Sequence, residues 1–376
     1  MTAPTRILHL HSSFSLGGKE ARAVRLMNLM GPCAVHSIVS AVPDSLGARA
    51  AIGAEIAVDL PGAAAPPLHG RPGLRGYRAL ARYMQGFDLV LSYNWGAMDG
   101  VMAHRLMSPF MRLPPLIHHE DGFNEDEAVR RNWKRNAFRR LALPTARALV
   151  VPSESLRHIA RTEWACDARL VRNGVDVSAY AAAPDVAIPG LRRRAGDVII
   201  GTVAGLRAVK DLPRLVRAVA ALPDHVLLVI VGEGPERGTI IAEAERQGMA
   251  ERLIMPGFMA APYRWIGQFD LLALSSRSEQ LPIAVIEAMA AGLPVVSPAV
   301  GDVAAMVSAE NRPYISAPDA DLAAALMPLV GDGNQRQRIG IANTARAATL
   351  FDEAAMVAAY DALYGAAVGG RSLFGS

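Results

Sequence analysis

The chain has 376 residues, of which 51% are apolar and 20% are charged, and its formal net charge is +4. This length predicts two domains, and this composition excludes an intrinsically disordered protein. The small excess of basic residues is compatible with anionic ligands or a membrane surface and requires neither.

Neither disulfide chemistry nor a membrane-spanning helix is indicated. Cys33 and Cys166 are the two cysteines, and they form no disulfide framework and no metal motif, so a reducing cytoplasm is the expected location. The first ten residues lack a basic region followed by a long apolar core, so no secretory signal is expected. No run of about 18 apolar residues occurs, and no spanning helix is predicted.

The first part of the chain alternates strands and helices. Arg6 to His11 predicts a buried strand, residues 12–18 a polar turn, and residues 19–30 a helix. Strand, glycine turn and helix form the opening of a doubly wound α/β domain. Gly17 and Gly18 in the turn do not complete the Gly-x-Gly-x-x-Gly fingerprint, so a tight turn and a ligand-binding turn both remain open.

A titratable cluster follows the strand predicted at residues 116–117. His118, His119, Glu120 and Asp121 are consecutive and precede Gly122. A single histidine at a strand end is more often structural than catalytic. Three titratable residue types followed by a glycine favour a functional loop.

Residues 130–143 combine arginines and a lysine with apolar residues at helical spacing, among them Trp133 and Phe138. Such a basic amphipathic helix can lie on an anionic membrane, with Arg130 to Arg140 facing the lipid. The alternative, slightly favoured, is a solvated basic face over a buried apolar one. One basic helix without a recognised module does not predict nucleic-acid binding.

The domain link is expected within residues 181–196, which are rich in alanine and proline and then basic. We therefore predict a first domain over residues 1–180 and a second over residues 196–350. The last helix is expected at residues 351–364, and the tail at residues 365–376 is expected to be disordered.

The second domain opens with a strand at residues 198–203, and two cations follow it. Arg207 and Lys210 precede a helix predicted at residues 212–222, where the helix dipole disfavours positive charge. That penalty indicates an anion nearby, and such a pair can neutralise a leaving diphosphate without a metal. Asp319 and Asp321 have the spacing of a metal-binding Asp-x-Asp pair but fall at an exposed helix start.

Residues 275–298 predict a loop, a helix from Pro282, a stop at Gly292 and a strand. Glu279 lies before the helix, and Glu287 lies about one and a half turns inside it. A helix N-terminus binds phosphate, and a carboxylate inside the helix can accept ribose hydroxyls. The alternative is a capped helix with a solvent-exposed Glu287.

The sequence from Glu279 to Val296 resembles the signature of family-4 glycosyltransferases, which are retaining enzymes. Residues 205–210 resemble the family's Gly-x-Leu-x-x-x-Lys motif, with Leu206 and Lys210 at its spacing and Gly205 directly before the leucine. Residues 118–122 resemble its His-x-Glu-His-Gly loop, with Asp121 where the second histidine is usual. The resemblance implies an α/β fold of the GT-B class, in which two Rossmann-like doubly wound domains face a central cleft and the last helix packs onto the first domain.

The resemblance also implies a role for each motif residue. Glu279 is expected to face the donor sugar, and Glu287 to bind the ribose of the nucleotide. Arg207 and Lys210 are expected to stabilise the leaving diphosphate, and His118, or failing that Asp121 or His119, to position the sugar. Further donor-binding positions are expected in the cleft turns, beside the base and along the diphosphate: Gly17, Gly18, Gly205, Gly232, Phe258, Leu281, Pro282 and Ile283.

The expected function is transfer of a sugar, with retention, from a nucleotide-diphosphate donor to a glycan or lipid-linked acceptor in bacterial-type polysaccharide or glycolipid synthesis. No metal or other cofactor and no nucleic-acid partner are expected. If residues 130–140 meet lipid, the location is peripheral at the inner face of the membrane. Two alternatives remain: a sugar-nucleotide epimerase on the same scaffold, and a non-catalytic subunit that binds nucleotide sugars.

Overall fold

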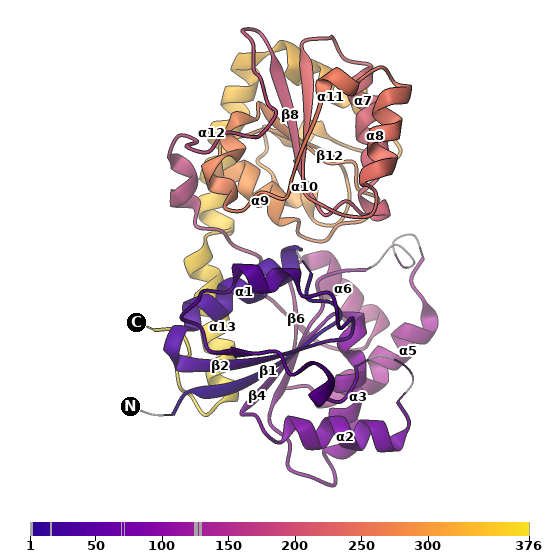
Figure 1. Ribbon diagram of the computed structural model, residues 1–376, viewed down its shortest axis with the longest axis vertical. Helices are drawn as coiled ribbons and strands as arrows, with labels where there is room; N and C mark the ends of the chain where they lie inside the picture. Colours follow the sequence, from indigo (N-terminus) through magenta and orange to yellow (C-terminus); the bar gives the residue numbers. More distant parts are fainter. Residues whose placement is uncertain are drawn as a thin grey trace. The chain divides into compact units, whose positions relative to one another are not determined.

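The computed structural model describes residues 3–15, 17–68, 70, 72–123, 127 and 130–375, which form two compact units (Figure 1). The first contains the chain up to Gly122, Arg131–Arg172 and the chain from Met356 onward. The second contains Asn173–Ala355 and the short segment Phe123–Arg130. The division falls after Arg172, so residues 173–180 and the expected link belong to the second unit.

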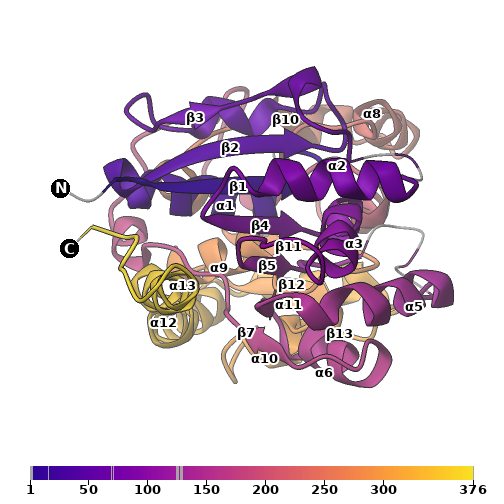
Figure 2. The same cartoon turned by 90° about the horizontal axis from the view of Figure 1, so that it is seen from below.

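The first unit is built on a parallel sheet in the order β3-β2-β1-β4-β5-β6-β7. Strand β1 pairs with both β2 and β4, so the direction of winding reverses between β1 and β4. Figure 2 shows the strands of this sheet in order, with β3 at one edge and β7 near the other. The strands are β1 (Thr5–His11), β2 (Ala34–Ser40), β3 (Val58–Asp59), β4 (Leu89–Tyr93), β5 (Leu116–His119), β6 (Ala148–Val151) and β7 (Ala168–Leu170).

Helices cover the sheet of the first unit, and the apolar side chains of α1 and α13 share one cluster with its strands. Helix α13 joins the first unit from Met356 onward, as the sequence led us to expect of the last helix. The helices are α1 (Gly18–Met30), α2 (Leu74–Met84), α3 (Met98–Met107), α5 (Trp133–Ala142), α6 (Glu154–Glu163) and α13 (Glu353–Ala367).

The C-terminal tail is ordered against this unit, so the expectation of a disordered tail is wrong for residues 365–375. Leu373 is fully buried and Phe374 nearly so. The Asp361 carboxylate accepts hydrogen bonds from the backbone N–H of Leu373 and the hydroxyl of Ser372, both at 2.8 Å. Two apolar side chains and the Asp361 carboxylate hold a terminal segment that was expected to be loose because of its place at the chain end.

The second unit has a parallel sheet in the order β10-β9-β8-β11-β12-β13. Its winding reverses between β8 and β11, the order of a doubly wound nucleotide-binding domain. Its strands are β8 (Val198–Val203), β9 (Val226–Val231), β10 (Leu253–Gly257), β11 (Leu271–Ala273), β12 (Val295–Pro298) and β13 (Ile315–Ser316). Its helices are α7 (Leu212–Ala220), α8 (Arg237–Arg246), α9 (Ile283–Ala290), α10 (Val303–Met306), α11 (Leu322–Gly331) and α12 (Gly333–Leu350). None of the described helices of either unit is long and apolar enough to cross a membrane.

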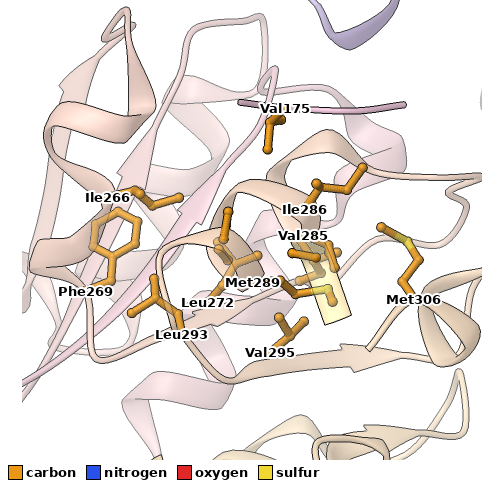
Figure 3. Close-up of a cluster of buried hydrophobic side chains, with 14 of the residues drawn as sticks. Val175, Ile266, Phe269, Leu272, Val285, Ile286, Met289, Leu293, Val295 and Met306 are labelled. Carbon is orange, nitrogen blue, oxygen red and sulfur yellow. The ribbon is translucent and has the colours of Figure 1, made fainter. Parts of the chain in front are cut away.

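Helix α9 is held by an apolar cluster on one face of this sheet. Figure 3 shows Val285, Ile286 and Met289 of α9 beside Leu272 and Val295 of the sheet. All five side chains are fully buried. Because burying each such side chain stabilises the fold by about 1.5–3 kcal/mol, the position of α9 is fixed by its packing.

The buried histidines of the first unit include His9 and His11 on β1, His36 on β2 and His119 on β5. Nε2 of His9 lies 2.9 Å from Nδ1 of His36. Burial, which disfavours the charged imidazole, lowers the pKa of all four and brings that of His36 to about 4. These histidines are therefore neutral in the folded protein at pH 7.

This burial predicts that acid destabilises the fold. The pKa of His36 falls from 6.5 to about 4 on folding, so the unfolded chain binds the proton first as the pH drops below 6.5. The free energy of unfolding should therefore fall between pH 7 and pH 4, with His36 contributing about 3 kcal/mol. Urea titrations at pH 7.5, 6 and 5 measure this change. His36→Asn should make the free energy of unfolding depend less on pH, whereas His158→Asn, at an exposed histidine, should not. An unchanged slope in His36→Asn would refute this origin of the acid sensitivity.

Candidate functional site: the carboxyl edge of each sheet

The loops after β8 and β11 meet at the carboxyl edge of the second sheet, beside the point where its winding reverses. Nζ of Lys210 lies 2.5 Å from Oε1 of Glu279, and the hydroxyl of Ser276 donates to the same oxygen at 2.7 Å. The backbone N–H of Arg277 donates to the carbonyl of Val209 at 2.9 Å. Lys210 and Glu279, which the sequence analysis identified as candidates and which lie 69 positions apart, are thus in direct contact.

Helix α9 begins directly after this contact. Pro282 is its N-cap residue, in an extended conformation, and makes no side-chain cap hydrogen bond. The first-turn N–H groups of such a helix are available to an anion, and the positive end of the helix dipole attracts one. Leu281 is buried, whereas Pro282 and Ile283 are half-buried, so the expected diphosphate segment reaches the surface at its second and third residues.

Two glycines allow neighbouring backbones to approach these loops. Gly232 has φ +141°, and a Cβ placed on it would lie 1.9 Å from the carbonyl oxygen of Ala204. Gly301 has φ +54°, and a Cβ there would lie 2.4 Å from the carbonyl oxygen of Glu279. Gly205 meets no such constraint, since the nearest atom to its Cβ position is Nε of Arg207 at 3.7 Å. Gly232 therefore supports the packing of the site.

Glu287 is half-buried on α9, and the side chain of Tyr180 lies beside it. Burial raises the pKa of Glu287 to about 7, and the hydrogen bond from Tyr180 partly offsets that rise. The alternative of a solvent-exposed Glu287 is therefore wrong. Its carboxylate is held in one place and changes its charge near neutral pH.

The remaining donor candidates of this unit are accessible. Arg207 is exposed and Lys210 is half-buried. Phe258 directly follows β10 and is 52% exposed, so its ring can stack against a planar ligand. These side chains follow β8 and β10 and therefore share the carboxyl edge of the sheet with Glu279.

In the first unit the titratable loop follows β5. His118 is fully buried, and its Nδ1 lies 2.9 Å from the hydroxyl of Ser92. His119 is buried as well, and its Nε2 lies 2.9 Å from the hydroxyl of Tyr364. Asp121 is partly exposed and accepts two hydrogen bonds from Arg22, at 2.6 and 2.9 Å. Of the three candidates, Asp121 is the one that reaches the surface.

Arg139 is buried, which corrects the expectation of a continuous basic surface over residues 130–140. Its Nε donates to Oε2 of Glu120 at 3.1 Å, and its guanidinium lies 5.0 Å from the ring of Trp95 and 4.8 Å from that of Trp164. A paired arginine between two aromatic rings can be buried at acceptable cost. Helical spacing alone cannot distinguish it from a solvated one.

Gly17 and Gly18 lie at the start of α1, next to the carboxyl end of β1. Gly17 is the N-cap residue with φ −168°, an extended conformation that any residue adopts. A Cβ there would meet the movable carboxylate of Glu20 at 2.8 Å. The backbone therefore does not require glycine at position 17, and the ligand-binding interpretation of this turn stays a prediction.

Sequence reasoning missed the residues that hold the others in place. Arg22 fixes Asp121, Ser276 fixes Glu279, and Tyr180 fixes Glu287. Asn94 is a fourth: it has φ 58°, and its Oδ1 accepts from the backbone N–H of Asp121 at 2.7 Å. Arg22, Tyr180 and Asn94 lie far from their partners in the sequence, whereas Ser276 is three residues from Glu279. The available signals were the position of Asn94 at a strand end and the closeness of Ser276 to Glu279.

Two family profiles match consecutive parts of the chain. The profile described as Glycosyltransferase Family 4 matches residues 16–179, and the one described as Glycosyl transferases group 1 matches residues 187–346. The chain belongs to glycosyltransferase family 4. The predicted family is thereby confirmed.

Curated members of the family are distant in sequence. The D-inositol 3-phosphate glycosyltransferase of Corynebacterium glutamicum is 26% identical over 320 residues, 77% of this chain and 74% of that protein. The 2-deoxystreptamine glucosyltransferase of Streptomyces kanamyceticus is 28% identical over 195 residues, 48% of this chain and 50% of that protein. The chain thus spans about half the length of that relative, and likewise 46% of the Bacillus subtilis protein EpsF.

Solved structures of other proteins share the fold. Anabaena HepE, in complex with UDP and glucose, has a TM-score of 0.76 at 19% identity and covers 96% of this chain and 100% of its own. WaaG, a glycosyltransferase of lipopolysaccharide biosynthesis, has a TM-score of 0.68 at 15% identity, with coverage of 96% and 100%. The predicted α/β fold of the GT-B class, with two Rossmann-like domains, is confirmed.

The buried carboxylate of Glu287 generates a prediction on stability. Its pKa rises from the ordinary value of 4.5 to about 7 on folding, so between these pH values the folded protein keeps the proton that the unfolded chain releases. The free energy of unfolding therefore falls as the pH rises from 4.5 to 7. Glu287→Gln keeps an acceptor for Tyr180 and removes this cost. The variant without ligand should be about 1–3 kcal/mol more stable than wild type at pH 8 and equal to it at pH 4.5.

Urea titrations at the two pH values measure the difference. The exposed Glu310 provides the matched control, since Glu310→Gln removes the same charge outside the site. A Glu287→Gln protein that is less stable than wild type at pH 8 would contradict the picture of a strained, half-buried carboxylate.

Proposed function

We propose that this chain is a retaining glycosyltransferase that moves a sugar from a nucleoside diphosphate donor to a glycan or lipid-linked acceptor. The observation that carries the proposal is the contact of Lys210 with Glu279 at the N-terminus of α9, with Glu287 further along the same helix. Structures of similar fold contain UDP, with glucose or as UDP-glucose, which supports a nucleotide-sugar donor and makes uridine the first base to test.

In this proposal the diphosphate lies at the start of α9, between the helix N-terminus and the side chains of Arg207 and Lys210. The ammonium of Lys210 carries three donors, so it can keep Glu279 and still bind a phosphate oxygen. The charge that develops on the departing diphosphate is then met by two cations and a helix dipole. No metal is needed in this scheme.

Retention is part of the proposal, and the surroundings of Glu279 favour one way of achieving it. Retaining hydrolases place a carboxylate nucleophile close to the anomeric carbon. The Oε1 of Glu279 already accepts from Lys210 and Ser276, which makes this carboxylate a better hydrogen-bonding group for the sugar than a nucleophile. In the proposed mechanism the acceptor hydroxyl attacks from the side that the diphosphate leaves, the bond from the anomeric carbon to the diphosphate breaks, and a diphosphate oxygen takes the proton.

Arg207 provides the cleanest test of this mechanism. Lys210→Ala would leave Glu279 without its cation, whereas Arg207→Ala removes one exposed charge and disturbs no other site residue. Turnover should fall by about 10²–10³-fold with the fold intact. Arg277 is an exposed arginine on the neighbouring loop, paired with Asp211, and Arg277→Ala is the matched control.

Activity is measured as nucleoside diphosphate released together with a new glycosidic bond, with and without EDTA. The expected result is a large loss in Arg207→Ala, little change in Arg277→Ala and no effect of EDTA. Equal activities of the two variants would remove Arg207 from the mechanism, and nucleotide release without a new glycosidic bond would favour another reaction on this scaffold.

We further propose that α5 of the first unit meets an anionic membrane that presents a lipid-linked acceptor. Trp133 is 72% exposed and Leu141 56%, with Lys134 and Arg140 exposed between them. Phe110, at 81% exposure, follows α3, which packs against α5. An aromatic anchor with flanking cations suits the interface between lipid headgroups and acyl chains.

Vesicle co-sedimentation tests this surface. Binding to vesicles with anionic lipid should weaken with salt and fall about fivefold for each of Lys134→Ala and Arg140→Ala, since a basic residue near such a surface contributes about 1 kcal/mol. Arg157 and Arg161 on α6 are also exposed and serve as controls. If the protein does not bind anionic vesicles at low salt, or if the α6 variants weaken binding as much as the α5 variants do, the basic face of α5 is simply solvated.

A further inference from the structure

Residues 173–181, at the start of the long segment of the second unit, lie against α9 and the loop before it. Nδ2 of Asn173 donates to the carbonyl oxygen of Leu281 at 2.9 Å, and Asn173 is 7% exposed. Seven residues later the side chain of Tyr180 packs against the cluster that holds α9, close enough to Glu287 for each group to shift the pKa of the other. One short segment therefore contacts the loop before α9 and the carboxylate within it.

This segment is itself held firmly. The backbone of Val175 accepts from the N–H of Glu353 at 3.0 Å and donates to the carbonyl of Phe351 at 2.9 Å. A Cβ on Gly174 would lie 2.9 Å from the carbonyl oxygen of Asp352, so the two backbones are in close contact. The carboxylate of Asp176 accepts from the hydroxyl of Ser178 at 2.6 Å and caps the turn that carries Tyr180.

The apolar side chains of the segment share the packing of α9. Val175 and Val177 are buried in the same cluster as Val285 and Ile286 of α9. In the view of Figure 3, Val175 lies at the top, near Ile286. Tyr180 packs against this cluster, and its ring makes an edge contact with Tyr263 at 6.2 Å. The ring of Tyr180 is therefore held by the cluster on one side and by Tyr263 on the other.

We propose that Tyr180 is a positioning residue for nucleotide binding: its hydroxyl donates to one oxygen of Glu287 and aims the other oxygen at the ribose hydroxyls. The inference rests on the proposed function, because it takes Glu287 as the group that binds ribose. A phenol offers one O–H donor, so it occupies one carboxylate oxygen and leaves the second free for the ligand.

Burial and the acidic residues around Tyr180 keep its phenol protonated, so that its O–H can donate a hydrogen bond. Burial raises the pKa of Tyr180, and Glu287, Asp176 and Glu353 raise it further, so the phenol stays protonated throughout the working range. The same hydrogen bond lowers the pKa of Glu287 against the effect of burial. Without the hydroxyl, Glu287 should hold its proton to a higher pH, and a protonated carboxyl is a poorer acceptor for two ribose hydroxyls.

The test is Tyr180→Phe, which keeps the ring and removes the hydroxyl. Wild type is first titrated with UDP, GDP and ADP, and the tightest of the three is used with its 2′-deoxy analogue at pH 6.5, 7.5 and 8.5. At pH 7.5 the variant should bind the ribonucleotide about five- to tenfold more weakly, as expected for one lost hydrogen bond to a charged group. The loss should shrink at pH 8.5, where Glu287 ionises again, and should be smaller for the deoxy analogue.

Two controls separate positioning from a general loss of structure. Tyr314→Phe removes a hydroxyl from a tyrosine that packs on the other apolar cluster of the same unit, and it should bind as wild type does. In a Glu287→Gln background, Tyr180→Phe should cause no further loss and no pH dependence, because the group that it orients is already changed.

The outcomes are distinct. If Tyr180→Phe binds like wild type at every pH, or loses the same factor at every pH and in the Glu287→Gln background, Tyr180 is structural only and the inference is wrong. If wild type binds none of the three nucleoside diphosphates, the proposed function fails and the inference falls with it. If Glu287→Gln weakens binding and Tyr180→Phe does not, the proposed function stands and only the positioning role is lost.

Discussion

The ion pair between Lys210 and Glu279 is the interaction on which the candidate donor site depends. It joins the loop after β8 to the loop after β11, the two strands between which the winding of the sheet reverses. Parallel strands deliver their carboxyl ends to one edge, so this reversal leaves an opening between the two loops where a ligand can bind. Because α9, which its apolar packing fixes, begins where the second loop ends, the pair lies directly before the helix N-terminus.

The two units use buried charge differently. In the second unit, Lys210 and Glu279 remain partly accessible, so a diphosphate can compete for the ammonium. In the first unit, the Arg139–Glu120 pair is buried, and Arg22 donates to both carboxylate oxygens of Asp121. Removing one partner of such a pair leaves an uncompensated buried charge, which typically costs about 3–5 kcal/mol. The first unit therefore presents a rigid edge, whereas the second presents charges that a ligand can engage.

The sequence predicted the fold well because its strongest signals are local. Glycine turns, apolar runs and the helix start at Pro282 identified the two doubly wound sheets and α9. Three errors concern long-range packing: the division after Arg172, the burial of Arg139 and the ordered tail at residues 365–375. Helical spacing shows that Arg139 lies on a helix, but only the partner Glu120, 19 residues away, compensates its buried charge. Tyr180 was missed for the same reason, since its hydroxyl acquires a role only through Glu287.

The central claim of this account is that Glu287 binds the ribose and Glu279 the transferred sugar. Isothermal titration of Glu279→Gln and Glu287→Gln with the bare nucleoside diphosphate, beside kinetics with the full donor, tests it most directly. Glu287→Gln should weaken the nucleotide and the donor alike, with turnover nearly kept, because both ligands carry the ribose. Glu279→Gln should keep the affinity for the bare nucleotide and lose turnover, because it meets only the sugar, whose geometry changes in the transition state. Loss of bare-nucleotide affinity in Glu279→Gln, with affinity retained in Glu287→Gln, would contradict the account.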